Sequence, residues 1–155
     1  MGQKRYEKYT SIKKPLWLQN INMAVRAVIY GAAGWILEVL WTGLGSLAAG
    51  DPRLASHTYL WMFPIYSLAV FLEPVHDFIR KYNPVVRGSI YVILIFSVEY
   101  FTGWVLEMIT GFCPWHYDSG AAVDGYIRLD YAPVWFALGL LFERLHDFLD
   151  LITAK

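Results

Sequence analysis

Four apolar stretches dominate the pattern of hydrophobic and polar positions, and each contains or ends at an acidic residue. The first, residues 27–47, runs for 21 positions and holds one charge, Glu38. About 20 apolar residues are needed to cross a hydrocarbon core about 30 Å thick, so this stretch predicts a membrane-spanning helix. The other three stretches are short, and extending each through its glutamate gives spans of similar length. The four predicted spans are 27–47, 58–80, 88–111 and 128–150.

An internal repeat relates the two halves of this pattern. Gly-Trp-Ile-Leu-Glu at 34–38 recurs as Gly-Trp-Val-Leu-Glu at 103–107, and the Glu-x-x-His-Asp-Phe pattern of 73–78 recurs at 143–148. Repetition at a fixed spacing indicates two copies of one structural unit, here a helix pair. Because two helices return the chain to its starting side, both copies have the same orientation, as in parallel repeats related by an axis along the membrane normal. The two predicted copies are residues 24–82 and 93–152.

Composition agrees with this all-α membrane fold of four transmembrane helices. Hydrophobic residues make up 57% of the 155 residues and charged residues 17%, whereas about 25% of a soluble domain is charged. The alternative, a soluble bundle of buried hydrophobic helices, does not account for so high an apolar density. The formal net charge is zero, so no basic surface indicates a nucleic-acid partner. We therefore expect an integral, multi-pass protein whose surroundings are membrane lipids.

The distribution of basic residues predicts the orientation. Loops on the cytoplasmic side of a membrane carry the excess of Lys and Arg. The predicted loop between the second and third spans holds three of them, while the two predicted outer loops hold only Arg53 and Arg128. Both termini are therefore expected on the cytoplasmic side, with residues 1–23 as a basic amphipathic juxtamembrane segment and 24–152 as the transmembrane domain. The amino-terminal basic residues are Lys4, Arg5, Lys8, Lys13, Lys14 and Arg26.

Three glutamates fall inside the predicted spans. Glu99, Gly103 and Glu107 are spaced i, i+4 and i+8, which predicts two carboxylates on one helix face with a glycine between them. In the repeat, Glu38 and Gly34 correspond to Glu107 and Gly103. Each acid costs about 2.5 to 3.5 kcal/mol at the bilayer centre, so proton uptake, a water-filled cavity, a bound cation or an arginine must offset it. The structural alternative is that protonated carboxyls simply hydrogen-bond neighbouring helices.

The loop after the third span is rich in aromatic and hydrogen-bonding groups. Trp115, His116, Tyr117 and Asp118 follow one another directly above Glu107. Two interpretations remain open. The loop anchors the protein at the membrane interface, or it acts as a lid or ligand contact over the acidic site.

The glutamates and histidines superficially resemble the ligands of di-iron four-helix bundles, which combine Glu-x-x-His on two helices with a glutamate from each of two others. Depth argues against such a site, because Glu38 and Glu107 fall on the outer side of the midplane and the Glu-x-x-His pairs fall on the inner side. We expect no metal and no cofactor, and the single cysteine, Cys113, forms no multi-thiolate site. The Glu-x-x-His residues are instead predicted as a polar collar at the cytoplasmic interface. In that collar we expect Glu73 to pair with an arginine such as Arg144. The other members are His76, Asp77, His146 and Asp147.

Several of these residues carry a resemblance to a known family. The pattern Glu99-x3-Gly103-Trp104-x2-Glu107 followed by Pro-Trp-x-Tyr at 114–117, together with Phe-Pro-x-Tyr at 63–66 and Tyr-Ala-Pro-x-Trp at 131–135, resembles the transmembrane protein 229 family. Its bacterial members are labelled CmpB-like type IV ABC-transporter permeases. The family commonly has Trp-Asp-Tyr-Ser where this chain has Trp-His-Tyr-Asp-Ser at 115–119, which shifts the acid by two positions.

The resemblance implies transport. No phosphate-binding glycine loop occurs in the chain, so an ABC permease of this kind would need a separate ATPase chain or other complex subunits. The predicted function is transport or binding of a small ligand or cation at the carboxylates, by a module that forms a homo-oligomer. An enzyme that acts on a lipid or isoprenoid, and a purely structural subunit of a membrane complex, are the alternatives; an enzyme is the less expected.

Overall fold

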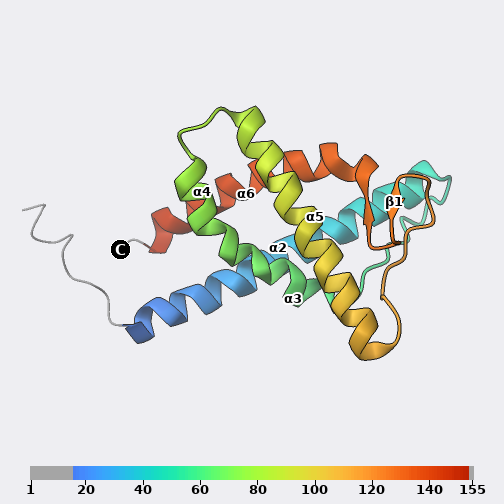
Figure 1. Ribbon diagram of the computed structural model, residues 1–155, viewed down its shortest axis with the longest axis horizontal. Coiled ribbons are helices and arrows are strands. Elements are labelled where there is room, and N and C mark those ends of the chain that lie inside the picture. The colour runs from blue at the N-terminus through green and yellow to red at the C-terminus, as the bar shows by residue number, and fades with distance from the viewer. Residues whose placement is uncertain (1–15, 154–155) are drawn as a thin grey trace, which may run out of the picture.

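The computed structural model describes residues 16–153, and the side chains of residues 23–152. Helices form most of this part of the chain (Figure 1). Three of them, Met23–Ala48, Met62–Ile79 and Pro84–Thr110, are long and apolar enough to cross a membrane. The elements are α2 (Leu16–Ala48), α3 (Met62–Ser67), η1 (Leu68–Leu72), α4 (Glu73–Ile79), α5 (Pro84–Thr110), β1 (Ala122–Val123), β2 (Ile127–Arg128), η2 (Leu129–Tyr131) and α6 (Ala132–Thr153).

The first predicted span lies within a longer helix. Helix α2 has 33 residues and is therefore about 50 Å long, which exceeds the thickness of a hydrocarbon core. Residues 16–23, which we assigned to a separate juxtamembrane segment, continue the same helix. The basic residues of that segment before residue 16 lie outside the described part of the chain.

The second predicted span is helical but broken in the middle. A 3-10 segment, Leu68–Leu72, separates α3 from α4, and Pro74 lies in the first turn of α4. Proline has no backbone N–H and its ring clashes with the carbonyl four residues earlier, here that of Val70. The amide of Glu73 instead donates to the Val70 carbonyl, which is the shorter i to i+3 bond of a 3-10 helix.

The third span begins four residues before the predicted position 88. The side chain of Asn83 accepts a hydrogen bond from the Val86 amide at 3.0 Å, and Pro84 occupies the first turn. An asparagine cap followed by proline is a favourable helix start. The helix ends at Gly111, whose left-handed φ of 82° is the usual glycine stop.

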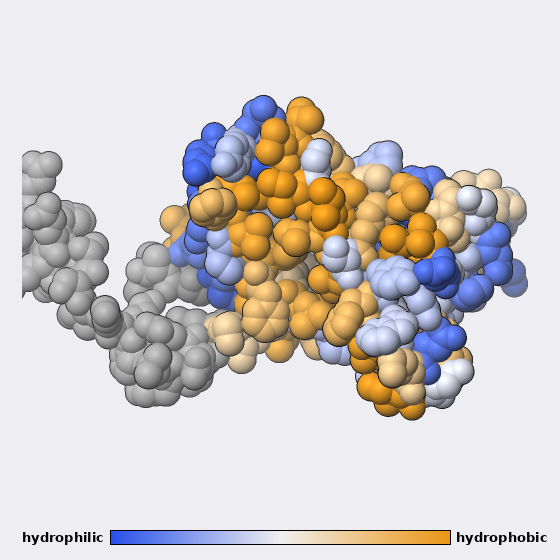
Figure 2. Space-filling model, viewed as in Figure 1, coloured by the Kyte–Doolittle hydropathy of each residue, from blue (hydrophilic) through white to orange (hydrophobic). Residues whose placement is uncertain are grey.

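The helices cross with their ends at two opposite poles of the molecule (Figure 1). The start of α2 and the end of α6 lie at one end, and the β hairpin lies at the other. Apolar residues cover the middle of the face in Figure 2, over α4 and α5, and hydrophilic residues gather toward the two ends. Exposed side chains such as Ile93, Phe101 and Met108 on α5 belong to this apolar surface. The distribution is the one expected of helices that face lipid.

Candidate functional site

Two of the three predicted carboxylates converge. Glu38 comes from α2 and Glu99 from α5, and the two are near enough for the charge of Glu38 to act on Glu99. Glu99 is 8% exposed and Glu38 is half-buried. No basic side chain among the described residues forms an ion pair with either carboxylate. The structure thus brings together two acidic groups from different helices without a compensating cation.

Aromatic hydroxyl groups surround this carboxylate pair. The Tyr117 hydroxyl donates a hydrogen bond to Glu99 Oε1 at 3.0 Å. Tyr66 of α3 makes the corresponding approach to Glu38, where Thr58 also lies. Tyr66 is also within electrostatic range of Glu99 and Tyr117, so the four groups act on one another. We call Glu38, Glu99, Tyr66 and Tyr117 the carboxylate cluster.

The hydrogen-bonding capacity of the cluster is not filled. Oε2 of Glu38 and Oε2 of Glu99 are both buried, and neither has a hydrogen-bond partner among the described residues. Trp135 approaches the Glu99 carboxyl, but its indole nitrogen makes no well-formed hydrogen bond within the described structure. A buried polar atom without a partner costs about 1 to 3 kcal/mol, and more when it is charged. The two oxygens thus lack a well-formed hydrogen bond, and the donors nearest to them, Thr58 Oγ1 and Trp135 Nε1, also have no partner among the described residues.

Gly34, which we predicted as part of the site, is the place where α2 and α3 meet. A Cβ atom at this position would lie 2.5 Å from Cγ of Tyr66. Only glycine lets the tyrosine ring lie against the helix backbone, and this contact holds Tyr66 next to Glu38.

Glu107 does not share the inward face of Glu99. Its side chain is exposed and accepts a hydrogen bond from the Tyr126 hydroxyl. Eight residues of an α-helix turn through about 800°, so position i+8 is rotated by about 80° from position i. Gly103, only four residues from Glu99, does face inward and receives the outer loop. A Cβ there would lie 3.1 Å from Tyr126 and 3.3 Å from Trp115.

The four predicted loop residues alternate between inward and outward positions. Trp115 is buried and its indole donates to the Tyr126 carbonyl at 3.0 Å, and Tyr117 reaches Glu99. His116 and Asp118 are exposed and pair with each other, Nε2 to Oδ1, at 3.2 Å. The inward residues fit the lid interpretation, because one of them touches the carboxylate cluster. The outward pair makes no contact with it.

A tight hairpin holds this loop in place. Strands β1 and β2 are joined by Asp124, Gly125 and Tyr126, and the Tyr126 amide donates to the Val123 carbonyl at 3.0 Å. Asp124 and Gly125, the central residues of this turn, have φ values of 51° and 76°, and an Asp-Gly pair with positive φ at both positions is favoured in hairpin turns. The Gly125 carbonyl then accepts the Tyr117 amide at 3.0 Å. Burial, followed by the nearby Glu99 charge, raises the pKa of Tyr117, so its hydroxyl keeps the proton that it donates.

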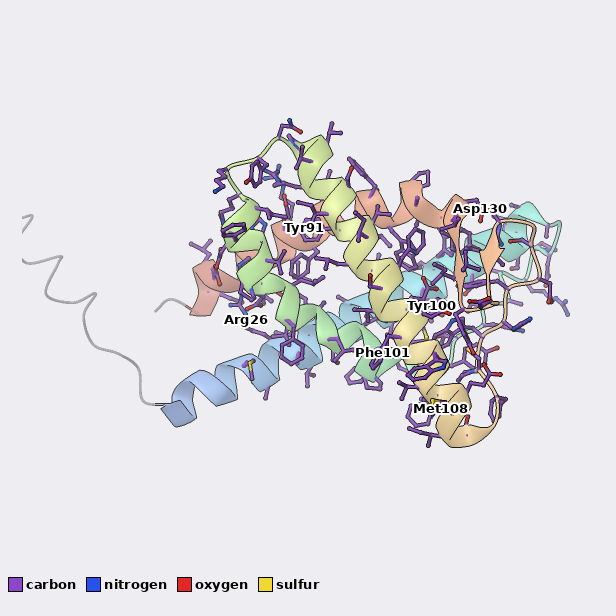
Figure 3. The ribbon with its side chains drawn as sticks, in the orientation of Figure 1. Arg26, Tyr91, Tyr100, Phe101, Met108 and Asp130 are labelled. Carbon is purple, nitrogen blue, oxygen red and sulfur yellow. The ribbon has the colours of Figure 1, made fainter. Side chains whose placement is uncertain are left out.

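A second polar network, for which the sequence predicted Glu73, His76 and His146 but not the arginines and tyrosines, lies nearer the other pole. Glu73 accepts hydrogen bonds from Nε of Arg26 and from the Tyr30 hydroxyl, both at 2.6 Å. Arg26 also reaches Nδ1 of His146 at 2.7 Å and Asp150 at 2.9 Å. Because an arginine only donates, Nδ1 of His146 is the acceptor and its proton lies on Nε2. Figure 3 places Arg26 toward the end of the molecule where α6 ends, away from Asp130.

The other half of this network repeats the same partners. Nε of Arg87 pairs with Glu143 at 2.9 Å, and the Tyr91 hydroxyl lies 3.1 Å from Nδ1 of His76. The ring centroids of His76 and His146 are 5.1 Å apart, edge to face. Each histidine contacts the ion pair of the opposite helix pair, so the two histidines of the predicted collar form a buried link between the two halves, whereas Asp77 and Asp147 remain accessible. The predicted Glu73–Arg144 pairing is wrong, since Glu73 binds Arg26 and Arg144 is exposed.

One sequence pattern indicates the positions of both the buried arginine network and the carboxylate cluster. The pattern Arg-x3-Tyr-x7-Glu occurs from Arg26 to Glu38 and again from Arg87 to Glu99, with an offset of 61 residues. The contacts follow this register, because Glu38 has Glu99 and not Glu107 as its counterpart. The twelve residues from arginine to glutamate correspond to about 18 Å along each helix. The network and the carboxylate cluster therefore occupy two levels of the same helices.

Metal coordination has little support in this part of the chain. Within the described residues, no three His, Cys, Asp or Glu side chains gather as metal ligands. Burial raises the pKa of the Cys113 thiol, which makes it a poor nucleophile.

Comparison with known proteins identifies the family. The model of the family described as Putative ABC-transporter type IV matches residues 26–153. Comparison with curated proteins and with solved structures gave no match. The match includes both glutamates of the cluster and the whole buried network. Together with the three apolar helices, it fits a membrane protein involved in transport. The chain belongs to the family described as Putative ABC-transporter type IV, as the resemblance noted from its motifs implied.

Proposed function

We propose that this protein is a membrane transport module that binds a small cation between Glu38 and Glu99. The observation that carries the proposal is the convergence of two carboxylates from two apolar helices, each with a buried unpartnered oxygen. Such a pair is costly in a membrane unless a cation or a proton accompanies it. Intramembrane acids of this kind commonly mark ion and substrate pathways.

The proposal includes four spans, with α6 as the fourth. Helix α6 has 22 residues, and its acidic and histidine side chains Glu143 and His146 are buried in the network rather than directed at lipid. The other charged residues of α6, Arg144, Asp147 and Asp150, all lie in its last ten residues, which supports a crossing with that end at the membrane interface. We further propose two parallel repeats, with α2 and α5 related by 61 residues and α4 and α6 by the 70 residues that separate Glu73 from Glu143, and with both termini cytoplasmic. The positive-inside distribution of Lys and Arg supports that orientation.

In this arrangement the two polar levels have different roles. The arginine network sits toward the cytoplasmic side and joins the two helix pairs through histidines that reach across to the opposite pair. The carboxylate cluster lies toward the outer side, below the hairpin that carries Tyr117. We propose that the network fixes the helix pairs and that the hairpin covers the binding site.

Partner chains are part of the proposal. A bundle this thin leaves both sides of α5 and α2 largely exposed, for example at Ile36 and Phe101. Self-association would shield the exposed carboxylate of Glu107 from lipid, so we propose a homo-oligomer. Energy for net transport would come from a separate ATPase chain.

Exchange of labelled cations in proteoliposomes tests the function without an energy source. Vesicles with the purified protein are loaded with unlabelled Na⁺, K⁺ or methylammonium, and uptake of the matching radiolabelled cation is followed. We expect exchange of at least one cation by the wild type, loss of exchange for Glu38→Gln and Glu99→Gln, and unchanged exchange for Glu107→Gln. Glu107→Gln is the matched control, since it removes the same charge from an exposed position on the same helix. No exchange by the wild type, or equal rates in all variants, would contradict the proposal.

A further inference from the structure

The unfilled hydrogen bonds of the carboxylate cluster indicate which kind of cation it takes. We propose that the ligand is a small primary or secondary alkylammonium ion, held by two N–H donors between Glu38 Oε2 and Glu99 Oε2. This inference rests on the proposed function and specifies its substrate class. The independent observation behind it is Glu99 itself, more than nine-tenths buried, with one oxygen bonded to Tyr117 and the other without a partner among the described residues.

The donor set fits an ammonium ion better than a metal ion. Ca²⁺ takes six to eight oxygen ligands, and Mg²⁺ requires near-ideal octahedral geometry. The cluster supplies two carboxylates and two tyrosine hydroxyls, and the Tyr117 hydroxyl already donates its proton to Glu99. A tyrosine that donates to a carboxylate keeps its proton and is a weak metal ligand. Two N–H groups, by contrast, satisfy the two available oxygens directly.

The need for N–H donors selects against quaternary ammonium ions. A quaternary ion matches the negative charge but has no N–H to donate, so the buried oxygens of Glu38 and Glu99 would stay unpaired. Leaving such a group unpaired costs the full desolvation penalty, which is larger for a charged acceptor. An ion with at least two N–H donors bridges the carboxylates and removes this cost.

The surroundings suit a short alkyl group. Tyr66 and Tyr117 lie close together beside the carboxylates, Trp135 approaches Glu99, and the rings of Tyr117 and Tyr131 are 6.0 Å apart. Aromatic side chains attract organic cations and also pack against methyl groups. Methylammonium, the smallest alkylammonium ion with at least two N–H donors, is therefore the first probe.

Binding of radiolabelled methylammonium to the protein in lipid nanodiscs tests the inference. We expect saturable binding that dimethylammonium displaces and that tetramethylammonium, Na⁺ and Mg²⁺ at equal concentration do not. Loss of a charge-assisted hydrogen bond in Glu99→Gln should weaken binding about 10- to 100-fold. Glu107→Gln should leave binding unchanged. Thermal unfolding of each variant shows that the loss does not come from misfolding.

The outcomes separate this inference from the proposed function. Equal competition by tetramethylammonium would overturn the N–H requirement and leave an aromatic cation site. Saturable Na⁺ or Mg²⁺ binding that depends on Glu99, without methylammonium binding, would overturn the ligand class and leave the cation function intact. If none of the cations binds, both proposals fall.

Discussion

Replacing Gly34 by alanine tests the contact that positions Tyr66. The added Cβ would lie 2.5 Å from Tyr66 Cγ and 2.7 Å from its Cβ. Carbon atoms pack at about 3.5 to 4.0 Å, so the ring must retreat by roughly 1 Å or the helices must separate. Overpacking of this kind costs about 1 to 3 kcal/mol, and the higher helix propensity of alanine returns up to about 1 kcal/mol. From the middle of that range, the full return of about 1 kcal/mol leaves an expected net destabilisation of about 1 kcal/mol.

The matched control is Gly45→Ala in the same helix. No atom lies within 4 Å of a Cβ at position 45, so this variant should be neutral or slightly more stable. Equilibrium unfolding in mixed micelles with increasing SDS, followed by circular dichroism, gives the two free energies. Because Tyr66 lies beside Glu38, Gly34→Ala should also weaken methylammonium binding, while Gly45→Ala should not. Equal stability and equal binding in the two variants would refute the close approach of α2 and α3.

Three further predictions concern the network and the hairpin. Glu143→Gln should destabilise the protein by about 3 kcal/mol in the same assay, the low end for a broken buried ion pair, because the Arg87 side chain is 20% exposed. Gly125→Ala should open the hairpin, since φ is +76° and the new Cβ would overlap the His116 ring; increased protease cleavage between 113 and 131 would show it. The bond to Glu107 raises the pKa of Tyr126 to about 12, so its stabilising contribution is complete below the ordinary tyrosine pKa of about 10 and is lost as the pH rises through 12. Tyr126→Phe should therefore lose less thermal stability than the wild type between these two pH values, and an equal loss in both proteins would contradict the assignment.

The apolar pattern predicted the helices well and their internal geometry less well. Each of the four expected stretches lies in a helical region, with shifts at the ends that come from local capping, as at Asn83 and Pro84. The break between α3 and α4 follows from Pro74 and could have been expected from the sequence. The burial of Glu143 and His146 in the second half of α6 could not have been expected, because it depends on partners in other helices.

The site was predicted in part. Glu38, Glu99, Gly34 and Tyr117 come together, whereas Glu107 turns outward because i+8 is not the same helix face. The repeated pentapeptide favoured Glu107 as the counterpart of Glu38, since local identity is strongest in that register. The contacts follow the weaker Arg-x3-Tyr-x7-Glu pattern, which fixes how far along each helix the polar groups lie.

The roles of Tyr66 and Trp135 were also missed. Both belonged to motifs that carried the family resemblance, but nothing in their spacing tied them to a glutamate on another helix. Contacts between helices depend on crossing angles and on where glycines allow close approach, as at Gly34 and Tyr66.

The pairing of Glu38 with Glu99 is tested most directly by cross-linking in native membranes. Cysteines replace Glu38 and Glu99, or Glu38 and Glu107, in a Cys113→Ser background, and a short bifunctional thiol reagent is added. Mass spectrometry then distinguishes links within one chain from links between chains. The carboxylate cluster predicts efficient cross-linking within one chain for the Glu38–Glu99 pair and little for the Glu38–Glu107 pair. Preferential linking of Glu38 to Glu107 would contradict it and would restore the register of the repeated pentapeptide.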